Sequence, residues 1–126
     1  MEDDCGSNPP KKFLEAIDQF NREEYYECHD TLENLWRAEK GGIRNLYKGI
    51  LQIGVGIYHG RRSNLRGALR LISSGMELTR RFGPFCLGID VELFLQTNGQ
   101  LKDELEKMEP GQRLSSDLIP KIRRSA

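Results

Sequence analysis

The part of this sequence that most constrains the fold is an apolar, glycine-rich stretch at residues 41–60. A helix advances about 100° per residue, so a helix here carries apolar side chains around most of its circumference. One face presents Leu46, Ile50, Ile53 and Ile57, and the opposite side presents Tyr47, Leu51, Val55 and Tyr58. Because a helix that is apolar nearly all round is typical of the interior of a bundle, we predict that residues 43–60 form the central helix.

The remaining stripe of this helix is polar and rich in glycine. Asn45, Gln52 and His59 recur at seven-residue steps, and they are flanked by Gly49, Gly56 and Gly60. Each glycine costs a helix roughly 0.5 to 1 kcal/mol relative to alanine, but the missing side chain lets a second helix approach closely. We therefore expect another helix to pack against this stripe.

Four further segments show apolar residues at three- and four-residue spacing, the pattern of amphipathic helices. They cover residues 11–21, 23–39, 65–82 and 90–108, and most are separated by glycine or proline. Ser63 or Asn64 can cap the third of them and Asp90 the fourth, whereas Asn98-Gly99 is a point where the fourth can kink or divide. The predicted fold class is all-α, a compact bundle of about five helices around the central glycine-rich helix.

The same pattern divides the chain into three parts. Residues 1–10 are acidic and polar and then proline-rich, so we expect a disordered N-terminal segment. Residues 11–112 form the helical domain. Leu118, Ile119 and Ile122 give the tail, residues 113–126, an apolar side, and we expect it to be partly docked on the domain.

Charge and cysteine usage narrow the class of protein. Lys and Arg number 19, as do Asp and Glu, so the balanced charge makes binding of nucleic acid through bulk electrostatics unfavourable. No apolar run approaches 18 residues, which excludes a transmembrane helix, and the N-terminus lacks the pattern of a secretory signal. Cys5, Cys28 and Cys86 fit neither a disulfide framework nor a zinc site of close cysteine pairs. We therefore expect a reducing compartment, cytoplasmic or organellar, with Cys28 as a small core residue.

One group of polar residues has the spacing of a site. His29 and Glu33 are four residues apart and share a helix face, next to Asp30. If the helices on either side of Gly41 and Gly42 form an antiparallel hairpin, His29 and Glu33 lie level with about Gln52, and His59 lies about a turn and a half beyond. We therefore predict a polar cluster of His29, Asp30, Glu33, Gln52 and His59, bordered by Tyr26 and Trp36.

Three functions are compatible with this cluster. The first is a structural or small-ligand or ion-binding module, in which the polar groups lock two helices together and Gln52, Trp36 and Tyr26 contact a bound molecule. The second is a metal-dependent hydrolase, with His29, Glu33 and His59 as ligands of a divalent transition metal and Asp30 as the candidate general base. The third is an RNA-associated accessory protein that uses an arginine-rich face of Arg61, Arg62, Arg66, Arg70, Arg80 and Arg81, although a solvated charged face is the simpler reading. A homodimer is also compatible with the broad apolar face of residues 65–82.

The sequence also resembles a known family. Tyr25-Tyr26-Glu27-Cys28-His29-Asp30, Glu33, Leu35-Trp36, Lys48-Gly49-Ile50-Leu51-Gln52, Tyr58-His59 and Gly67-Ala68 are similar to the pattern of the helical family catalogued as domain of unknown function 309. The similarity covers about residues 13–82. It implies an all-helical fold, and it implies that the signature positions are His29, Asp30, Glu33, Trp36, Gln52 and His59. Asp30 stands where the family usually has Glu.

Overall fold

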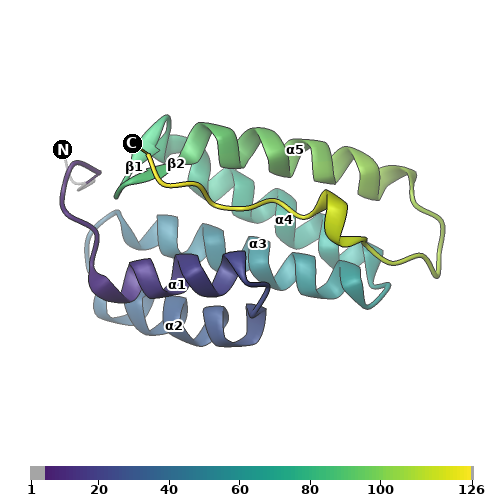
Figure 1. Cartoon of the computed structure of the whole chain (residues 1–126), viewed down its shortest axis with the longest axis horizontal. Coiled ribbons are helices and arrows are strands. Elements are labelled where there is room, and N and C mark those ends of the chain that lie inside the picture. Colours follow the sequence, from purple (N-terminus) through teal and green to yellow (C-terminus); the bar gives the residue numbers. More distant parts are fainter. Residues whose placement is uncertain (1–4, 126) are drawn as a thin grey trace.

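A computed structural model shows the arrangement of the chain and describes residues 5–125. Five α-helices are present in these residues, and each packs on the next in sequence (Figure 1). Their bounds are α1 Lys11–Asn21, α2 Tyr25–Ala38, α3 Arg44–Arg61, α4 Leu65–Thr79 and α5 Val91–Lys107. Two short 3-10 helices, η1 Arg80–Phe82 and η2 Ser116–Leu118, and a two-stranded antiparallel hairpin, β1 Phe85–Cys86 and β2 Ile89–Asp90, complete the fold. The predicted all-α bundle is confirmed.

Helix ends follow from local hydrogen bonding. The side chain of Asn64 accepts a hydrogen bond from the backbone N–H of Gly67 at 3.1 Å, and that of Asp90 accepts one from Leu93 at 2.9 Å. Both satisfy N–H groups that have no partner within the helix, and both caps were predicted. The helix does not divide at Asn98-Gly99, one of the two outcomes that the sequence allows there, because α5 is one helix over Val91–Lys107. Instead Asn98 is fully buried and donates through Nδ2 to the carbonyl of Phe94 at 2.8 Å, so α5 continues without a break.

The centre of the core lies on α3, as the sequence predicts. Leu46, Ile50, Ile53 and Ile57 are each at most 1% exposed. The opposite side is less enclosed than expected, because Tyr47 is buried whereas Tyr58 remains 42% exposed. The central helix therefore has one open edge, and that edge faces the beginning of α2.

The glycine stripe of α3 packs directly on α4. A Cβ placed on Gly49 would lie 2.9 Å from the carbonyl oxygen of Gly75, and one placed on Gly75 would lie 2.5 Å from the carbonyl oxygen of Gly49. At Gly56 a Cβ would meet the Cγ1 of Ile72 at 2.8 Å. The missing side chains thus allow the two backbones to touch, and α3 and α4 form the most extensive helix pair of the bundle.

One end of the bundle gathers segments that are far apart in sequence. Cys5 forms a disulfide with Cys86 of the hairpin, and the Cys5 carbonyl accepts a hydrogen bond from Leu87 at 2.9 Å. The expectation that these cysteines are unpaired was wrong, and the argument from them for a reducing compartment no longer holds. Cys28 is a free thiol that is 2% exposed, as predicted for a core residue. Of the segment predicted to be disordered, residues 1–4 lie outside the described residues.

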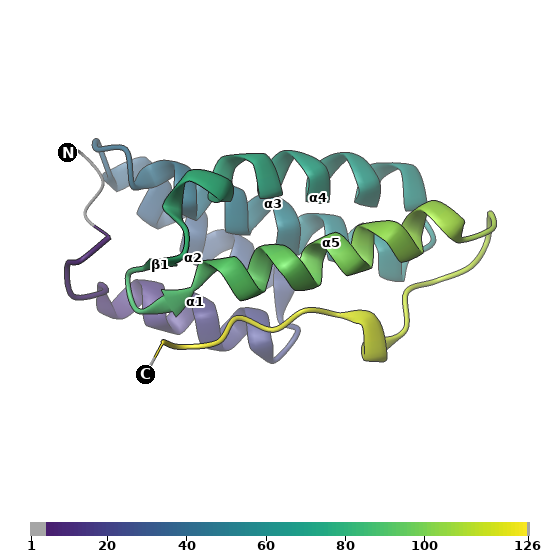
Figure 2. The ribbon, with the colours of Figure 1, turned by 90° about the horizontal axis from the view of Figure 1, so that it is seen from above.

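The C-terminal segment runs between α5 and α1 in Figure 1 and alongside α5 in Figure 2, in largely extended form. It buries Leu114, Ile119 and Ile122, which are all at most 7% exposed. Asn21, at the end of α1, donates to the carbonyl of Ile122 at 2.8 Å and accepts from its N–H at 2.7 Å. The tail is therefore held by hydrogen bonds between its own backbone and the Asn21 side chain, as well as by apolar contacts.

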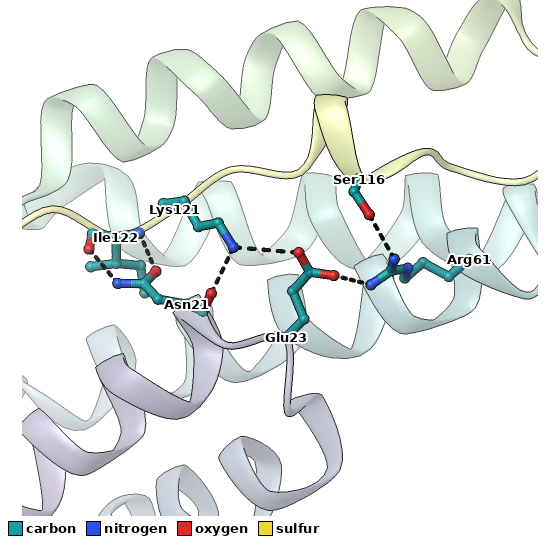
Figure 3. Close-up of polar contacts among 6 residues, drawn as sticks. All are labelled: Asn21, Glu23, Arg61, Ser116, Lys121 and Ile122. Carbon is teal, nitrogen blue, oxygen red and sulfur yellow. Dashed lines mark hydrogen bonds and ion pairs between the residues drawn. The ribbon is translucent and has the colours of Figure 1, made fainter.

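A network of charged groups reinforces this contact (Figure 3). Arg61 donates to the carboxylate of Glu23 and, at 3.0 Å, to the hydroxyl of Ser116. Lys121 lies 3.4 Å from the same carboxylate. Burial raises the pKa of Glu23, but the hydrogen bonds and charges of Arg61 and Lys121 outweigh that effect and hold the pKa below its ordinary value. The network thus joins the α1–α2 turn, the end of α3 and the tail.

Over residues 5–125, every helix is too short or too polar to cross a membrane.

Candidate functional site

A pocket of about 250 Å³ lies where the beginning of α2 faces the end of α3. Each helix contributes three residues: Tyr25, Tyr26 and His29 from α2, and Val55, Tyr58 and His59 from α3. Because the helices form an antiparallel pair, the first two turns of α2 meet the last two turns of α3. The result is a small hollow with largely aromatic walls and two imidazoles.

Three metal-ligating side chains converge next to this pocket. His29, Asp30 and Glu33 each offer one donor atom, and the three atoms lie within 4.8 Å of one another. The Nδ1 of His29 is 3.6 Å from the Oδ1 of Asp30. Glu33 also pairs with Arg37, whose guanidinium is 3.3 Å from its Oε2. The three side chains are between 36% and 61% exposed, so the cluster is open to solvent.

The remaining predicted cluster members, Gln52 and His59, and the bordering Tyr26 lie outside this compact group of three. His59 lines the same pocket as His29 but is not part of the compact group of three. Gln52 is half-buried, and its Oε1 is buried without a hydrogen-bond partner in the described chain. Tyr26 lines the pocket and is 74% exposed, so it forms an outer wall.

Trp36 is held by two cations from α3. The guanidinium of Arg44 lies 4.3 Å from the centroid of the indole ring, and the ammonium of Lys48 lies 5.7 Å from it. Arg44 also donates to the carbonyl of Trp36 at 3.4 Å. These contacts tie the end of α2 to the beginning of α3, at the opposite end of the helix pair from the pocket.

Two buried titratable groups of α2, Cys28 and Tyr25, are unsuited to act as nucleophiles. Burial raises the pKa of the Cys28 thiol to about 12, and its sulfur donates to the carbonyl of Ala16 at 3.4 Å. Burial likewise raises the pKa of Tyr25 well above its ordinary value, and the charge of Glu23 adds to this effect. Both groups therefore stay protonated at neutral pH.

The arginine-rich face is already partly engaged. Arg61 pairs with Glu23, and Arg62 donates to the hydroxyl of Tyr58 at 2.7 Å. Arg80 lies 3.8 Å from a carboxylate oxygen of Glu77. The use of this face for RNA stays a prediction, whose required sign is binding that weakens steeply with added salt.

Comparison with known proteins finds a family model and a curated relative that this chain resembles. The fold is all-helical, and residues 13–71, which hold the pocket and the three clustered donors, match the family model of the domain of unknown function DUF309. The predicted resemblance is confirmed. A similar curated protein is the uncharacterized protein YpuF of Bacillus subtilis (strain 168), which is 34% identical over 71 residues, 55% of this chain and 41% of YpuF. The chain thus spans less than half the length of that relative. No solved structure matches the chain significantly.

Three pocket residues were not among the predicted site residues. Tyr25, Val55 and Tyr58 line the pocket together with Tyr26 and the two histidines. A signal was present: Tyr25, Tyr26 and His29 follow the spacing i, i+1, i+4, and Val55, Tyr58 and His59 follow i, i+3, i+4. Each set projects from one side of its helix, and each ends in a histidine.

Proposed function

We propose that this chain is a binding module for a divalent transition metal, with His29, Asp30 and Glu33 as the protein ligands. The observation that carries the proposal is the convergence of the three donor atoms within 4.8 Å. One imidazole and two carboxylates form a mixed nitrogen and oxygen set, which suits zinc, manganese, iron or nickel. Bonds of about 2.0 to 2.2 Å place the donors of a tetrahedral ion about 3.5 Å apart, so the side chains close in by about 1 Å on binding.

The surroundings of the cluster support a site of moderate affinity. The donors come from two consecutive turns of one helix, so the backbone already holds them in place and little entropy is lost on binding. Solvent exposure gives an ion free entry and leaves a coordination position for water. Arg37 opposes binding, because its guanidinium competes for the Glu33 carboxylate.

Zinc titration of chelator-treated, tag-free protein by isothermal calorimetry tests the proposal. The wild type should bind one zinc ion, and His29→Ala should lose at least tenfold in affinity with its helical circular dichroism unchanged. Asn34→Ala, an exposed change on the same helix outside the cluster, is the matched control and should bind as the wild type does. If the wild type takes up no zinc, or His29→Ala binds equally well, the proposal is wrong.

Removal of the Arg37 guanidinium gives a second test, in which zinc affinity should rise instead of falling. Exposed ion pairs contribute about 0.2 to 1 kcal/mol, so Arg37→Ala should strengthen zinc binding by up to about fivefold. A nonspecific contribution of surface charge would also strengthen binding when Arg66, which lies on a different helix, is replaced by Ala. A site made by Glu33 responds to Arg37→Ala alone.

One observation favours the hydrolase as a second candidate, namely that His59 lines the same pocket as His29. In that arrangement His29, Glu33 and His59 would hold the metal, which would supply an activated water, and Asp30 would be the group placed to accept a proton from it. His59→Ala distinguishes the two candidates. Unchanged zinc affinity supports the module described above, whereas a large loss supports the hydrolase ligand set.

A further inference from the structure

The pocket beside the donor cluster has the size and lining of a site for a single aromatic ring. Its volume of about 250 Å³ lies below the roughly 300 to 1,000 Å³ of pockets that enclose drug-sized ligands. Its walls are three tyrosines, one valine and two histidines. Flat aromatic walls favour a flat occupant, because offset or edge-to-face ring contacts add to the gain from apolar burial.

The charges around the pocket favour an anionic ligand. The residues that line it include no carboxylate, and His29 and His59 are its nitrogen-bearing groups. The guanidinium of Arg62 lies 5.0 Å from the centroid of the Tyr58 ring and donates to the Tyr58 hydroxyl. One face of the Tyr58 ring is therefore already in contact with the Arg62 guanidinium. The nearby carboxylates of Asp30 and Glu33 are balanced once they ligate a divalent ion, so an ammonium group gains little in this pocket.

We infer that the pocket binds small single-ring aromatic carboxylates, with the ring between Tyr26 and Tyr58 and the carboxylate at the metal. This inference rests on the proposed metal site. A carboxylate has two oxygens, so one would bind the ion that His29 would help to hold, and the other would accept a hydrogen bond from His59, which lines the same pocket. Binding of the ring and binding of the metal are thus coupled through a single ligand.

Benzoate is the probe, and the full chain is titrated with it in zinc-loaded and zinc-free form while amide chemical shifts are followed by NMR. For a ligand of this size we expect a dissociation constant on the order of 1 mM for the zinc-loaded protein, and binding at least tenfold weaker without zinc. Two matched probes test the chemistry. Benzylamine replaces the carboxylate by an ammonium, and cyclohexanecarboxylate replaces the aromatic ring by a puckered one, so both should bind at least fivefold more weakly.

Two variants distinguish the loss of benzoate binding in the pocket from the loss of zinc binding. Tyr26→Ala combined with Tyr58→Ala removes exposed walls, so it should keep the fold and the zinc affinity while benzoate binding falls at least tenfold. His59→Ala should likewise retain zinc and lose benzoate affinity. Circular dichroism and the zinc titration of each variant establish that it is folded and loaded.

The outcomes distinguish this inference from the function on which it rests. If zinc does not bind at all, both are overturned. If zinc binds as proposed but benzoate does not, or benzylamine binds equally well, only the aromatic carboxylate is overturned. Benzoate binding that is independent of zinc also overturns it, because the carboxylate is then not on the metal.

Discussion

Replacement of Gly75 by alanine tests the close contact between α3 and α4. The added Cβ would lie 2.5 Å from the carbonyl oxygen of Gly49 and 2.6 Å from the Cγ1 of Ile53, whereas ordinary contact begins at 3.4 Å. The helices would have to separate by nearly 1 Å, since the first of these atoms is backbone. Overpacking of this kind costs about 1 to 3 kcal/mol. The better helix propensity of alanine returns about 0.5 to 1 kcal/mol, which leaves a net loss of about 1.2 kcal/mol at the middle of the two ranges and of about 2.5 kcal/mol at most.

Gly99 of α5 provides the matched control. A Cβ there would meet only the terminal carbon of Met76, at 3.9 Å, which is ordinary contact. Gly99→Ala should therefore raise the free energy of unfolding by about 0.5 to 1 kcal/mol. Urea unfolding followed by circular dichroism should separate the midpoints of the two variants by about 1 M or more. If Gly75→Ala is as stable as Gly99→Ala, the argument from close helix contact is refuted.

Three further changes give defined results. The pKa of Glu23 is lower in the folded protein than in the unfolded chain. Its contribution to the free energy of unfolding is therefore complete above the unfolded-state pKa and is lost as the pH falls through the folded-state pKa. In thermal scans, Glu23→Gln should therefore cost about 1 kcal/mol at pH 7 and less as the pH falls below about 4, whereas a similar cost for Glu27→Gln, an exposed carboxylate outside the network, would exclude a specific network. Cys5→Ser should lower the free energy of unfolding by about 2 to 4 kcal/mol, and reducing agent should have no further effect on this variant. Asn64→Ala should cost about 1 kcal/mol through the lost helix cap, and an unchanged denaturation midpoint would contradict that role.

The helices could be predicted from sequence because each carries its own periodic apolar pattern and its own end signals. The bounds of α1 agree with the predicted residues, and the cap of α5 by Asp90 was read from its position before an apolar run. The disulfide could not be predicted in this way. Cys5 and Cys86 are 81 residues apart, and only the folded chain brings the hairpin to the N-terminal segment.

The candidate site was predictable only in part, for a similar reason. Spacing along one helix places His29 and Glu33 together, and this local rule holds. The positions of Gln52 and His59 relative to them depend on the rotation of α3 about its axis and on side-chain conformation. Neither is set by helix periodicity alone, so Tyr26, His29 and His59 were predicted as site residues whereas Tyr25, Val55 and Tyr58 were not.

The contact of α3 with α4 gives the candidate site two walls of unequal stiffness. At Gly49 and Gly75 the two backbones are in contact, so no side chain there can rotate to absorb a shift. We therefore expect α3 and α4 to move as one rigid helix pair. Tyr58 and His59 belong to α3 and so to this pair. The opposing wall is α2, which meets α3 through side chains that can change rotamer. We therefore expect adjustment to a bound molecule to take place in the side chains of α2 rather than in α3.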